Sequence, residues 1–217
     1  VGGTGLYIDS LIYEIEYPNI EFDEEYRKLL EKKVQEEGLE SLYQEAKKID
    51  EKAVQKISQH DQKRILRILE IYHATGKTKT QQEEESRRKE TEFDYYVYAL
   101  HWERDILYDR INKRVDIMLQ QGLVQEVQMI LNKYSQFPTA MQGLGYKEVV
   151  EYLEKKCTKE EMVEKIKQET RRYAKRQLTW FRKNKQTVWL EGKEKTEDNI
   201  QVILEDINWK NNQIKLR

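Results

Sequence analysis

Apolar residues recur at helical spacing along most of the chain. Between residues 22 and 76 they follow one another every three or four positions, as in Phe22, Tyr26 and Leu30. Asp61 is suited to cap the last helix of this stretch, and Gly76 is suited to end it. The pattern predicts several amphipathic helices here and no convincing strand.

Other segments depart from this spacing. Residues 93–102, FDYYVYALHW, are dense in aromatic and β-branched side chains and form the best candidate strand. Residues 187–190 predict a second, short strand, and the opening VGGTGLYI is typical of a strand end, a glycine turn and a helix start. Residues 77–92 have no apolar period and predict a mobile loop.

Helical spacing returns after the candidate strand. It predicts helices over residues 103–121 and 123–134, one after the glycine turn near residue 145, a long one from residue 158, and a terminal helix. Strands therefore lie on both sides of an all-helical block.

The simplest organisation is an α/β core that carries a helical insertion. Residues 1–19 and 91–217 would form the core, which ends with a basic helix, and residues 20–90 would form the insertion. The alternative is a plain helical domain with minor strands.

Composition narrows the class of protein. The 217 residues include 39 Lys and Arg against 40 Asp and Glu, a net charge of −1, with 36% charged and 10% aromatic residues. High but balanced charge with many aromatic side chains indicates a folded, helix-rich protein. No apolar run approaches the roughly 18 residues of a membrane span, and the single cysteine, Cys157, excludes an internal disulfide. We therefore expect a cytoplasmic protein.

One segment concentrates positive charge. Residues 171–185 contain seven basic side chains and no acidic one. Like charges four residues apart destabilise an isolated helix by about a few tenths of a kcal/mol per pair, so a polyanionic partner would explain the segment. Lys and Arg would bind RNA phosphates, and Trp180 or Tyr173 would stack on an unpaired base. A solvated basic face is an equal alternative from composition alone.

Two arginines, Arg110 and Arg114, are four residues apart and so share one helix face. Paired guanidinium groups suit bidentate binding of phosphate or diphosphate. The alternative is that they form salt bridges to acids of the same helix, Asp105, Asp109 and Asp116.

Weaker candidates are helix starts and glycine turns. Lys63, Arg64 and Arg67 begin a predicted helix and would bind phosphate or form an exposed first turn. The turns at residues 2–5 and 143–145 let the backbone approach a phosphate or a nucleotide edge. No side chain stands out as a catalytic base, and the histidines and the cysteine lack the spacing of zinc ligands. No catalytic or metal-binding residue is therefore predicted.

Five ordered blocks of the sequence resemble one family. They are VGGTGLYI, DxxRILRxLEIYxxTGK from residue 61, RINKRVDxMLxxGLxxEV from residue 110, GLGYKE, and AKRQLTWFR from residue 174. These blocks, spread over nearly the whole chain, resemble the tRNA dimethylallyltransferases, also called tRNA isopentenyltransferases. The resemblance implies an α/β fold with a P-loop-NTPase-like parallel-sheet core, a helical insertion domain and a predominantly helical chain.

The resemblance also implies an activity and its partners. The family transfers a dimethylallyl group from dimethylallyl diphosphate to N6 of the adenosine just 3′ of the anticodon, with Mg²⁺. The expected partners are the anticodon stem-loop of tRNA and dimethylallyl diphosphate, and we expect a monomer without membrane association. By position, Arg110 and Arg114 match the arginines near the diphosphate. The tRNA-contacting segments match Thr4, Arg27, Lys63, Arg64, Arg67, Gln142, Gly143, Gly145, Tyr146, Lys147, Lys175, Arg176, Gln177, Thr179, Trp180 and Arg182.

The chain departs from the family pattern at one point. The family's phosphate loop, GxTxxGKS/T, and its Asp-Ser-x-Gln segment, which carries the catalytic base, do not occur in these 217 residues. We therefore expect an N-terminally truncated enzyme that is inactive alone and whose Mg²⁺ site lies outside the sequence. Two alternatives are an enzyme that prenylates free adenine nucleotides and a non-catalytic RNA-binding helical module.

Overall fold

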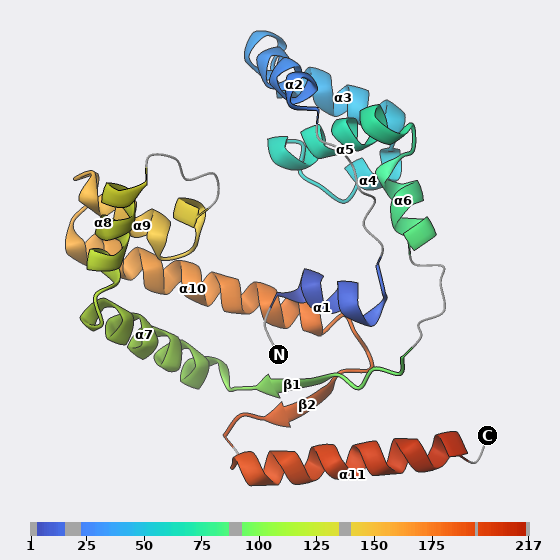
Figure 1. The fold of residues 1–217 in the computed structure, drawn as a ribbon, viewed down its shortest axis with the longest axis vertical. Coiled ribbons are helices and arrows are strands. Elements are labelled where there is room, and N and C mark those ends of the chain that lie inside the picture. The colour runs from blue at the N-terminus through green and yellow to red at the C-terminus, as the bar shows by residue number, and fades with distance from the viewer. Residues whose placement is uncertain (1–3, 16–22, 87–92, 135–139, 194, 216–217) are drawn as a thin grey trace. The chain divides into compact units, whose positions relative to one another are not determined.

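The computed structural model describes residues 4–15, 23–86, 93–134, 140–193 and 195–215. Contacts between residues divide the chain into two units, Thr4–Asp94 and Tyr95–Arg217. In the described residues the first unit contains helices, and the second contains helices and a pair of strands (Figure 1). The grouping of residues 1–19 with residues 91–217 in one core stays a prediction.

Polar side chains set where the helices of the first unit begin. These helices are α1 (Gly5–Ile12), α2 (Glu24–Glu37), α3 (Leu39–Ile49), α4 (Glu51–Val54), α5 (Gln62–Thr75) and α6 (Lys79–Ser86). The carboxylates of Asp23, Asp50 and Asp61 each accept a hydrogen bond from the backbone N–H three residues later and cap α2, α4 and α5. Gly76 ends α5 in the left-handed conformation, with φ at 67°. The predicted cap and stop of α5 are confirmed.

The core of the first unit lies where α5 packs against α3 and α2. Leu66 and Leu69 of α5 are buried in one apolar cluster with Leu42 of α3 and Leu30 of α2. Each such side chain contributes roughly 1.5–3 kcal/mol of hydrophobic stabilisation when fully buried. The helical spacing predicted over residues 22–76 is confirmed for the part of that stretch the structure describes.

Helix α6 corrects the prediction of a loop at residues 79–86, while residues 87–92 of that predicted loop lie outside the described residues. The backbone of α6 is anchored by a buried carboxylate: Asp50 accepts hydrogen bonds from the Thr80 backbone N–H at 2.8 Å and from the Thr80 hydroxyl at 2.6 Å. An ion pair between Lys79 and Glu83, one turn apart, supports it. The helix is held by polar contacts, so apolar periodicity could not reveal it.

The second unit connects two strands through a series of helices. Its elements are β1 (Tyr98–His101), α7 (Arg104–Gln120), α8 (Leu123–Lys133), the short 3-10 helix η1 (Ala140–Gln142), α9 (Tyr146–Leu153), α10 (Lys159–Phe181), β2 (Val188–Glu191) and α11 (Thr196–Lys215). The strands pair in parallel, with Tyr98 opposite Val188 and His101 opposite Glu191. The intervening helices make the long crossover that a parallel pair requires. The predicted fold class, a predominantly helical α/β chain with a parallel sheet, is confirmed, although β1 is shorter than the segment predicted over 93–102.

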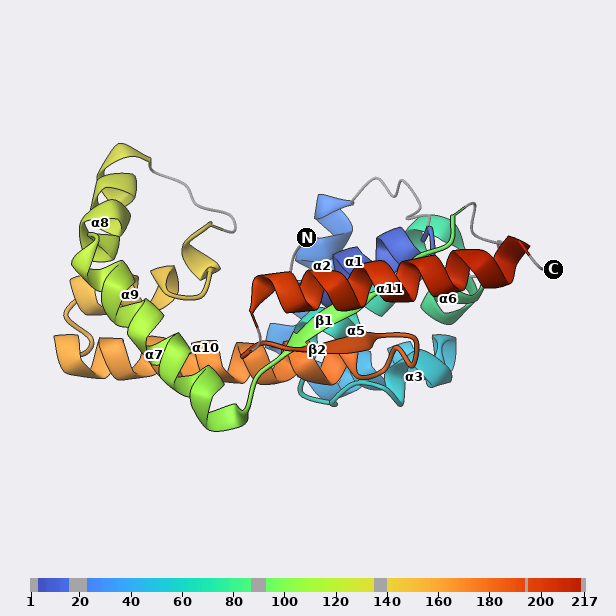
Figure 2. The ribbon, with the colours of Figure 1, turned by 90° about the horizontal axis from the view of Figure 1, so that it is seen from below.

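Helix α11 is attached to strand β1 by polar contacts. The Tyr98 hydroxyl donates a hydrogen bond to the Asp206 carboxylate at 2.7 Å, and the Lys210 ammonium lies 2.6 Å from the same carboxylate. Burial and the hydrogen bond to Asp206 raise the pKa of Tyr98 to about 12. Figure 2 shows α11 running along the two strands.

Helices α7 and α10 pack together and run antiparallel. The Arg171 guanidinium donates to the Asn112 side-chain oxygen at 2.6 Å, and the Lys167 ammonium lies 2.7 Å from the Asp116 carboxylate. Asn112, the earlier residue on α7, contacts the later residue on α10, and Asp116 contacts the earlier one, so the two helices are antiparallel. An apolar cluster that includes Val115 of α7 and both Met162 and Ile166 of α10 is buried beside these contacts. This packing fixes α10, the helix that carries the basic segment.

Candidate nucleic-acid interface

The local sequence explains why the basic segment is part of one long helix. The Thr158 hydroxyl accepts a hydrogen bond from the Glu161 backbone N–H, and the Glu161 carboxylate accepts one from the Thr158 backbone N–H. This reciprocal capping box begins α10 at Lys159. The helix carries acids in its first turn and bases toward its C-terminal end, the arrangement that the helix dipole favours.

The N-terminal basic residues of the segment serve the fold. Arg171 is bonded to Asn112 and lies 6.0 Å from the centre of the Tyr108 ring, so its guanidinium belongs to the α7–α10 contact. Arg172 pairs with Glu169 one turn earlier on the same helix. These two cations therefore have partners within their own unit.

The next basic residues along α10 face solvent. Lys175 and Arg182 are exposed and form no ion pair with any residue the structure describes. The Arg176 guanidinium lies 5.7 Å from the centre of the Tyr173 ring, and the Lys183 ammonium lies 5.2 Å from the Trp180 ring centre. From Lys175 onward, exposed cations thus form no ion pair among the described residues, and two of them, Arg176 and Lys183, lie beside aromatic rings.

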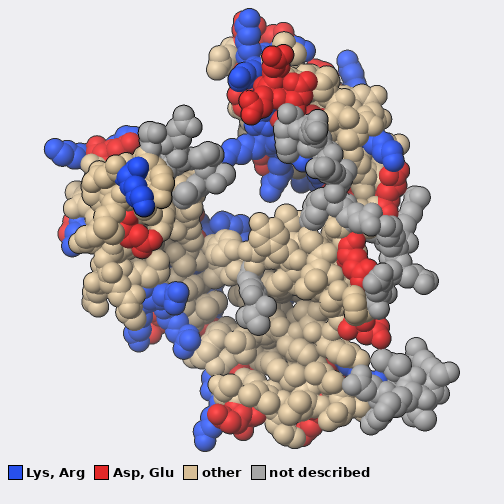
Figure 3. All heavy atoms as spheres, viewed as in Figure 1, with Lys and Arg blue, Asp and Glu red and all other residues tan. Residues whose placement is uncertain are grey.

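Two further residues predicted on this helix differ in accessibility. The Thr179 hydroxyl is exposed but donates to the Lys175 backbone carbonyl at 2.9 Å. Gln177 is half-buried. Figure 3 shows basic and acidic side chains interspersed on the face in view rather than gathered in one continuous patch. The candidate interface therefore rests on the local charge of α10.

The glycine turn before α9 is built by backbone geometry. The Gly143 carbonyl accepts hydrogen bonds from the Tyr146 and Lys147 backbone N–H groups, each at 3.1 Å. Gly145 has φ at 92°, which favours glycine, and its N–H donates to the buried Glu148 carboxylate at 2.8 Å. That N–H is consequently used inside the protein.

Side chains around this turn divide into exposed and anchored groups. Gln142 and Lys147 are exposed. The Tyr146 hydroxyl donates a hydrogen bond to the Glu126 carboxylate of α8, and this bond raises the pKa of Tyr146. Gln142 and Lys147 are therefore the accessible contacts here, and Tyr146 holds α9 to α8.

In the first unit the structure brings two separately predicted residues together. Arg27 and Lys63 both line a cavity of about 600 Å³ that Glu31, Ser58, His60, Asp61 and Gln62 complete. The Arg27 guanidinium contacts Glu31 and the buried Glu70, each at 2.8 Å, and these hydrogen bonds raise the pKa of Arg27. Arg27 therefore joins α2 to α5, and Lys63 is the exposed cation of this cavity.

The other residues predicted in this unit have local roles. Arg64 pairs with Asp61 at 2.8 Å and is still largely exposed, while one Arg67 guanidinium nitrogen lies 3.8 Å from Glu70. Thr4 precedes α1, and its carbonyl accepts hydrogen bonds from the Tyr7 and Ile8 backbone N–H groups. The exposed Thr4 side chain makes no capping hydrogen bond.

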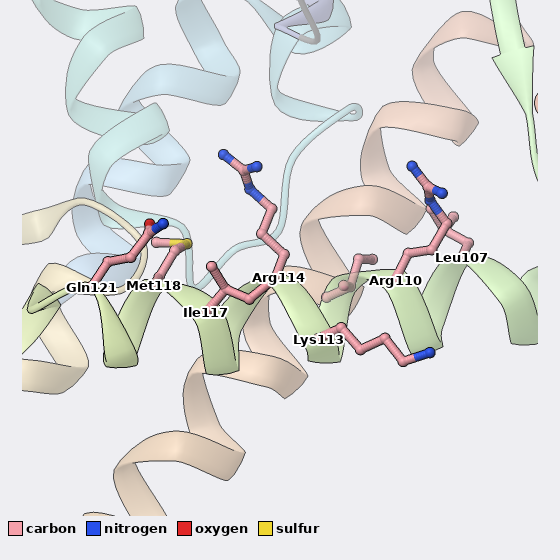
Figure 4. Close-up of a pocket in the computed structure, with 8 residues that line it drawn as sticks. Leu107, Arg110, Lys113, Arg114, Ile117, Met118 and Gln121 are labelled. Atoms are coloured by element: carbon pink, nitrogen blue, oxygen red, sulfur yellow. The ribbon is translucent and has the colours of Figure 1, made fainter.

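Arg110 and Arg114 project into one cavity along α7 (Figure 4). The cavity has a volume of about 510 Å³ and is lined by Leu107, Arg110, Ile111, Lys113, Arg114, Ile117, Met118 and Gln121. The Arg110 guanidinium lies 4.2 Å from the centre of a Trp102 ring. Paired cations and apolar side chains in one cavity suit an amphiphilic phosphate compound.

The salt bridges predicted as the alternative for these arginines do not form. Asp109 pairs instead with Lys113 at 2.7 Å, and Asp116 pairs with Lys167 at 2.7 Å. Neither Arg110 nor Arg114 has an ion pair among the described residues. Ile117 and Gln121 line the cavity but were not predicted, although their spacing of three and seven residues from Arg114 was readable.

Neither a metal-binding cluster nor a membrane-spanning helix occurs among the described residues. Within the ranges the structure describes, no three His, Cys, Asp or Glu side chains are placed to hold a metal ion. The described residues therefore do not by themselves form a site for the implied Mg²⁺. None of the described helices is long and apolar enough to cross a membrane.

Comparison with known sequences identifies one family. The family model described as IPP transferase matches residues 1–184. A tRNA dimethylallyltransferase of Acetivibrio thermocellus is 46% identical over 190 residues, 87% of this chain and 61% of the relative. One of Carboxydothermus hydrogenoformans is 45% identical over 198 residues, 91% of this chain and 64% of the relative. The chain spans about three fifths of the length of the curated relatives it matches.

Solved structures show the same likeness. The full-length tRNA isopentenylpyrophosphate transferase of Bacillus halodurans superposes with a TM-score of 0.64 at 36% identity, over 100% of this chain and 67% of that protein. A eukaryotic dimethylallyltransferase acting on tRNA superposes with a TM-score of 0.73 at 26% identity, over 100% of this chain and 56% of that protein. Sequence and fold therefore agree on the same family.

Proposed function

The chain belongs to the IPP transferase family, and from this premise we propose that it acts in tRNA modification, as part of a tRNA dimethylallyltransferase. The proposed reaction transfers a dimethylallyl group from dimethylallyl diphosphate to N6 of the adenosine just 3′ of the anticodon. The observation that carries the proposal is the family match over residues 1–184, which includes the cavity on α7 and most of the basic segment of α10.

In this proposal, exposed cationic side chains of the chain bind the RNA. Lys175, Arg176 and Arg182 bind phosphates of the anticodon stem-loop. Lys63 and Lys147, both exposed, add cationic contacts elsewhere on the chain. These assignments follow the resemblance by position and are supported by exposure, because an exposed cation can reach a phosphate.

The cavity on α7 is proposed to hold the diphosphate. N6 of the adenosine attacks C1 of the dimethylallyl group, the bond from C1 to oxygen breaks, and diphosphate leaves with the electron pair. Arg110 and Arg114 donate N–H groups to the diphosphate and stabilise the charge that develops as it leaves. By the resemblance, the proton from N6 goes to the aspartate of the Asp-Ser-x-Gln segment. Mg²⁺, implied by the resemblance alone, would supply further charge stabilisation when bound.

A complementation experiment tests this function. The 217-residue chain is compared with the same chain joined behind the N-terminal segment of the Acetivibrio thermocellus relative, with labelled dimethylallyl diphosphate as donor and tRNA or AMP as acceptor. We expect the chain alone to transfer nothing, and the joined protein to label tRNA and not AMP.

Three outcomes would contradict parts of this account. Labelling of tRNA by the 217-residue chain alone would overturn its expected inactivity. Labelling of AMP by the joined protein would favour a nucleotide prenyltransferase. Binding of tRNA by a folded joined protein that labels neither acceptor would favour a non-catalytic RNA-binding module.

A further inference from the structure

Helix α10 carries the same arrangement of an aromatic ring and a cation twice. Arg176 lies beside the ring of Tyr173, and Lys183 lies beside the ring of Trp180, at 5.7 and 5.2 Å from the ring centres. Each cation follows its ring by three residues, and the two rings are seven residues apart. Seven residues of α-helix rise about 10.5 Å and complete almost two turns. The rings therefore lie on one stripe along the helix.

Tyr173 is an accessible ring of this stripe. The residue is 38% exposed, and its hydroxyl makes no hydrogen bond within the described part of the chain. Arg176 lies near its ring, and Lys175 is exposed next to it in the sequence. Tyr173 is thus an aromatic surface surrounded by cations rather than part of the apolar core.

The charge around the stripe has one sign. No acidic residue occurs from Thr170 to Leu190, and Lys175 and Arg182 form no ion pair among the described residues. Of the two rings among these cations, Tyr173 is exposed and Trp180 is half-buried. Accessible rings beside cations are the combination that binds single-stranded nucleic acid, because bases stack on the rings while phosphates contact the cations.

We propose that Tyr173 is a stacking platform for an unpaired base of the RNA, with Arg176 beside it and Trp180 as a second ring on the same strand. This inference rests on the proposed function and adds a residue that the resemblance did not assign. The separation of the rings, about 10.5 Å, is about three times the 3.4 Å rise between stacked bases. This spacing matches bases about three nucleotides apart in one strand. A base that stacks on either ring must be unpaired and displaced from its neighbours, which selects a loop over a stem.

Salt dependence separates stacking from phosphate contacts. Stacking releases no counterions, so removing the ring weakens binding equally at every salt concentration and leaves the salt slope unchanged. The experiment measures the Kd of the chain for an anticodon stem-loop over a series of salt concentrations. We expect Tyr173→Leu to raise Kd at least about fivefold at each concentration, and Tyr173→Phe to bind as the unaltered chain does.

Tyr134→Leu is the matched control. Tyr134 follows α8, is 53% exposed and has Lys133 5.4 Å from its ring centre, so it presents a ring beside a cation away from α10. We expect this variant to bind as the unaltered chain does. Thermal melts of all three variants confirm that they are folded.

A second measurement identifies the nucleotide. Each loop base is replaced in turn by an abasic residue, and Kd is measured with the unaltered chain and with Tyr173→Leu. One abasic position should weaken the unaltered chain several-fold and add nothing to the loss in the variant. Additive losses at every position, or an unchanged Kd for Tyr173→Leu, would overturn the stacking role.

The failure of this inference is distinguishable from that of the proposed function. If the unaltered chain binds the stem-loop with a strong salt dependence and Tyr173→Leu has no effect, only the stacking role is lost. If the unaltered chain shows no salt-dependent binding, the RNA-binding function itself fails.

Discussion

Arg110 and Arg114 lie one turn apart on α7 with no carboxylate partner among the described residues. Their aspartate neighbours are used elsewhere, since Asp109 pairs with Lys113 and Asp116 pairs with Lys167. The cavity that contains both arginines also contains apolar side chains. Guanidinium groups that no described carboxylate neutralises suit the diphosphate end of a prenyl diphosphate, and the apolar side chains suit its prenyl end.

At this scale we predict that Arg114→Ala weakens diphosphate binding. Each hydrogen bond between charged groups contributes roughly 1.5–3 kcal/mol, so Kd for dimethylallyl diphosphate should rise at least about tenfold. Calorimetric titration of the chain measures it. Arg104→Ala is the control, because Arg104 is on the same helix, lies 5.2 Å from the centre of the Tyr108 ring and does not line the cavity. Equal Kd values for Arg114→Ala and the unaltered chain would contradict the diphosphate site.

Two arginines make contacts within the protein that their positions in the sequence did not indicate. The resemblance predicts that Arg27 contacts tRNA, yet its guanidinium joins Glu31 to Glu70 within the first unit. Arg171 belongs to the basic segment, yet it bonds to Asn112 of α7. Sequence spacing could not predict the contacts with Glu70 and Asn112, because these partners are 43 and 59 residues away in the chain and meet only after the helices pack. The pair of Arg27 with Glu31, one turn apart on α2, was readable from spacing.

Among the elements, α6 shows most clearly what periodicity can and cannot predict. Helices with an apolar stripe, such as α5, were readable from spacing, and the cap at Asp61 and stop at Gly76 were readable from local chemistry. Helix α6 has no apolar stripe and depends on the contact between Asp50 and Thr80, thirty residues apart. Strand β1 covers only Tyr98–His101, because these are the four residues that pair with β2.

The Asp50 contact gives a prediction at the scale of the element. Burial raises the pKa of Asp50, but hydrogen bonds from Thr80 and Ala53 outweigh it, and the net pKa is lowered. A lowered folded-state pKa means that the carboxylate stabilises the fold above its unfolded pKa near 4, and that this contribution is lost as pH falls through the folded value. Asp50→Ala should therefore lower the free energy of unfolding by about 2 kcal/mol at pH 7.

Denaturant unfolding at pH 7 and at about pH 3 measures both quantities. The difference in the free energy of unfolding between Asp50→Ala and the unaltered chain should be smaller at the lower pH. Thr80→Val removes only the hydroxyl bond and should cost less at pH 7. If this difference in the free energy of unfolding were the same at both pH values, the charge of the Asp50 carboxylate would not contribute to stability.

For the whole molecule, the balanced charge conceals a local asymmetry. The net charge is −1, yet no acid occurs from residue 170 to residue 190, and two exposed cations of that stretch, Arg176 and Lys183, lie beside aromatic rings. Acids elsewhere pair with basic residues outside that stretch, as Glu151 does with Lys165. Total charge is thus a poor guide to RNA binding in this chain, and the distribution of ion pairs is a better one.

In the proposed function, the C-terminal half of α10 binds the anticodon stem-loop through its phosphates. The most direct test is the slope of log Kd against log salt concentration for the chain and for Lys175→Ala with Arg176→Ala. Each phosphate contact contributes about 0.7–0.9 to this slope, so the double variant should reduce it by about 1.4–1.8. The control, Lys156→Ala with Lys165→Ala, removes the same charge from residues paired with Glu154 and Glu151, and should leave the slope near that of the unaltered chain. A slope that the Lys175 and Arg176 substitutions leave unchanged would contradict the account.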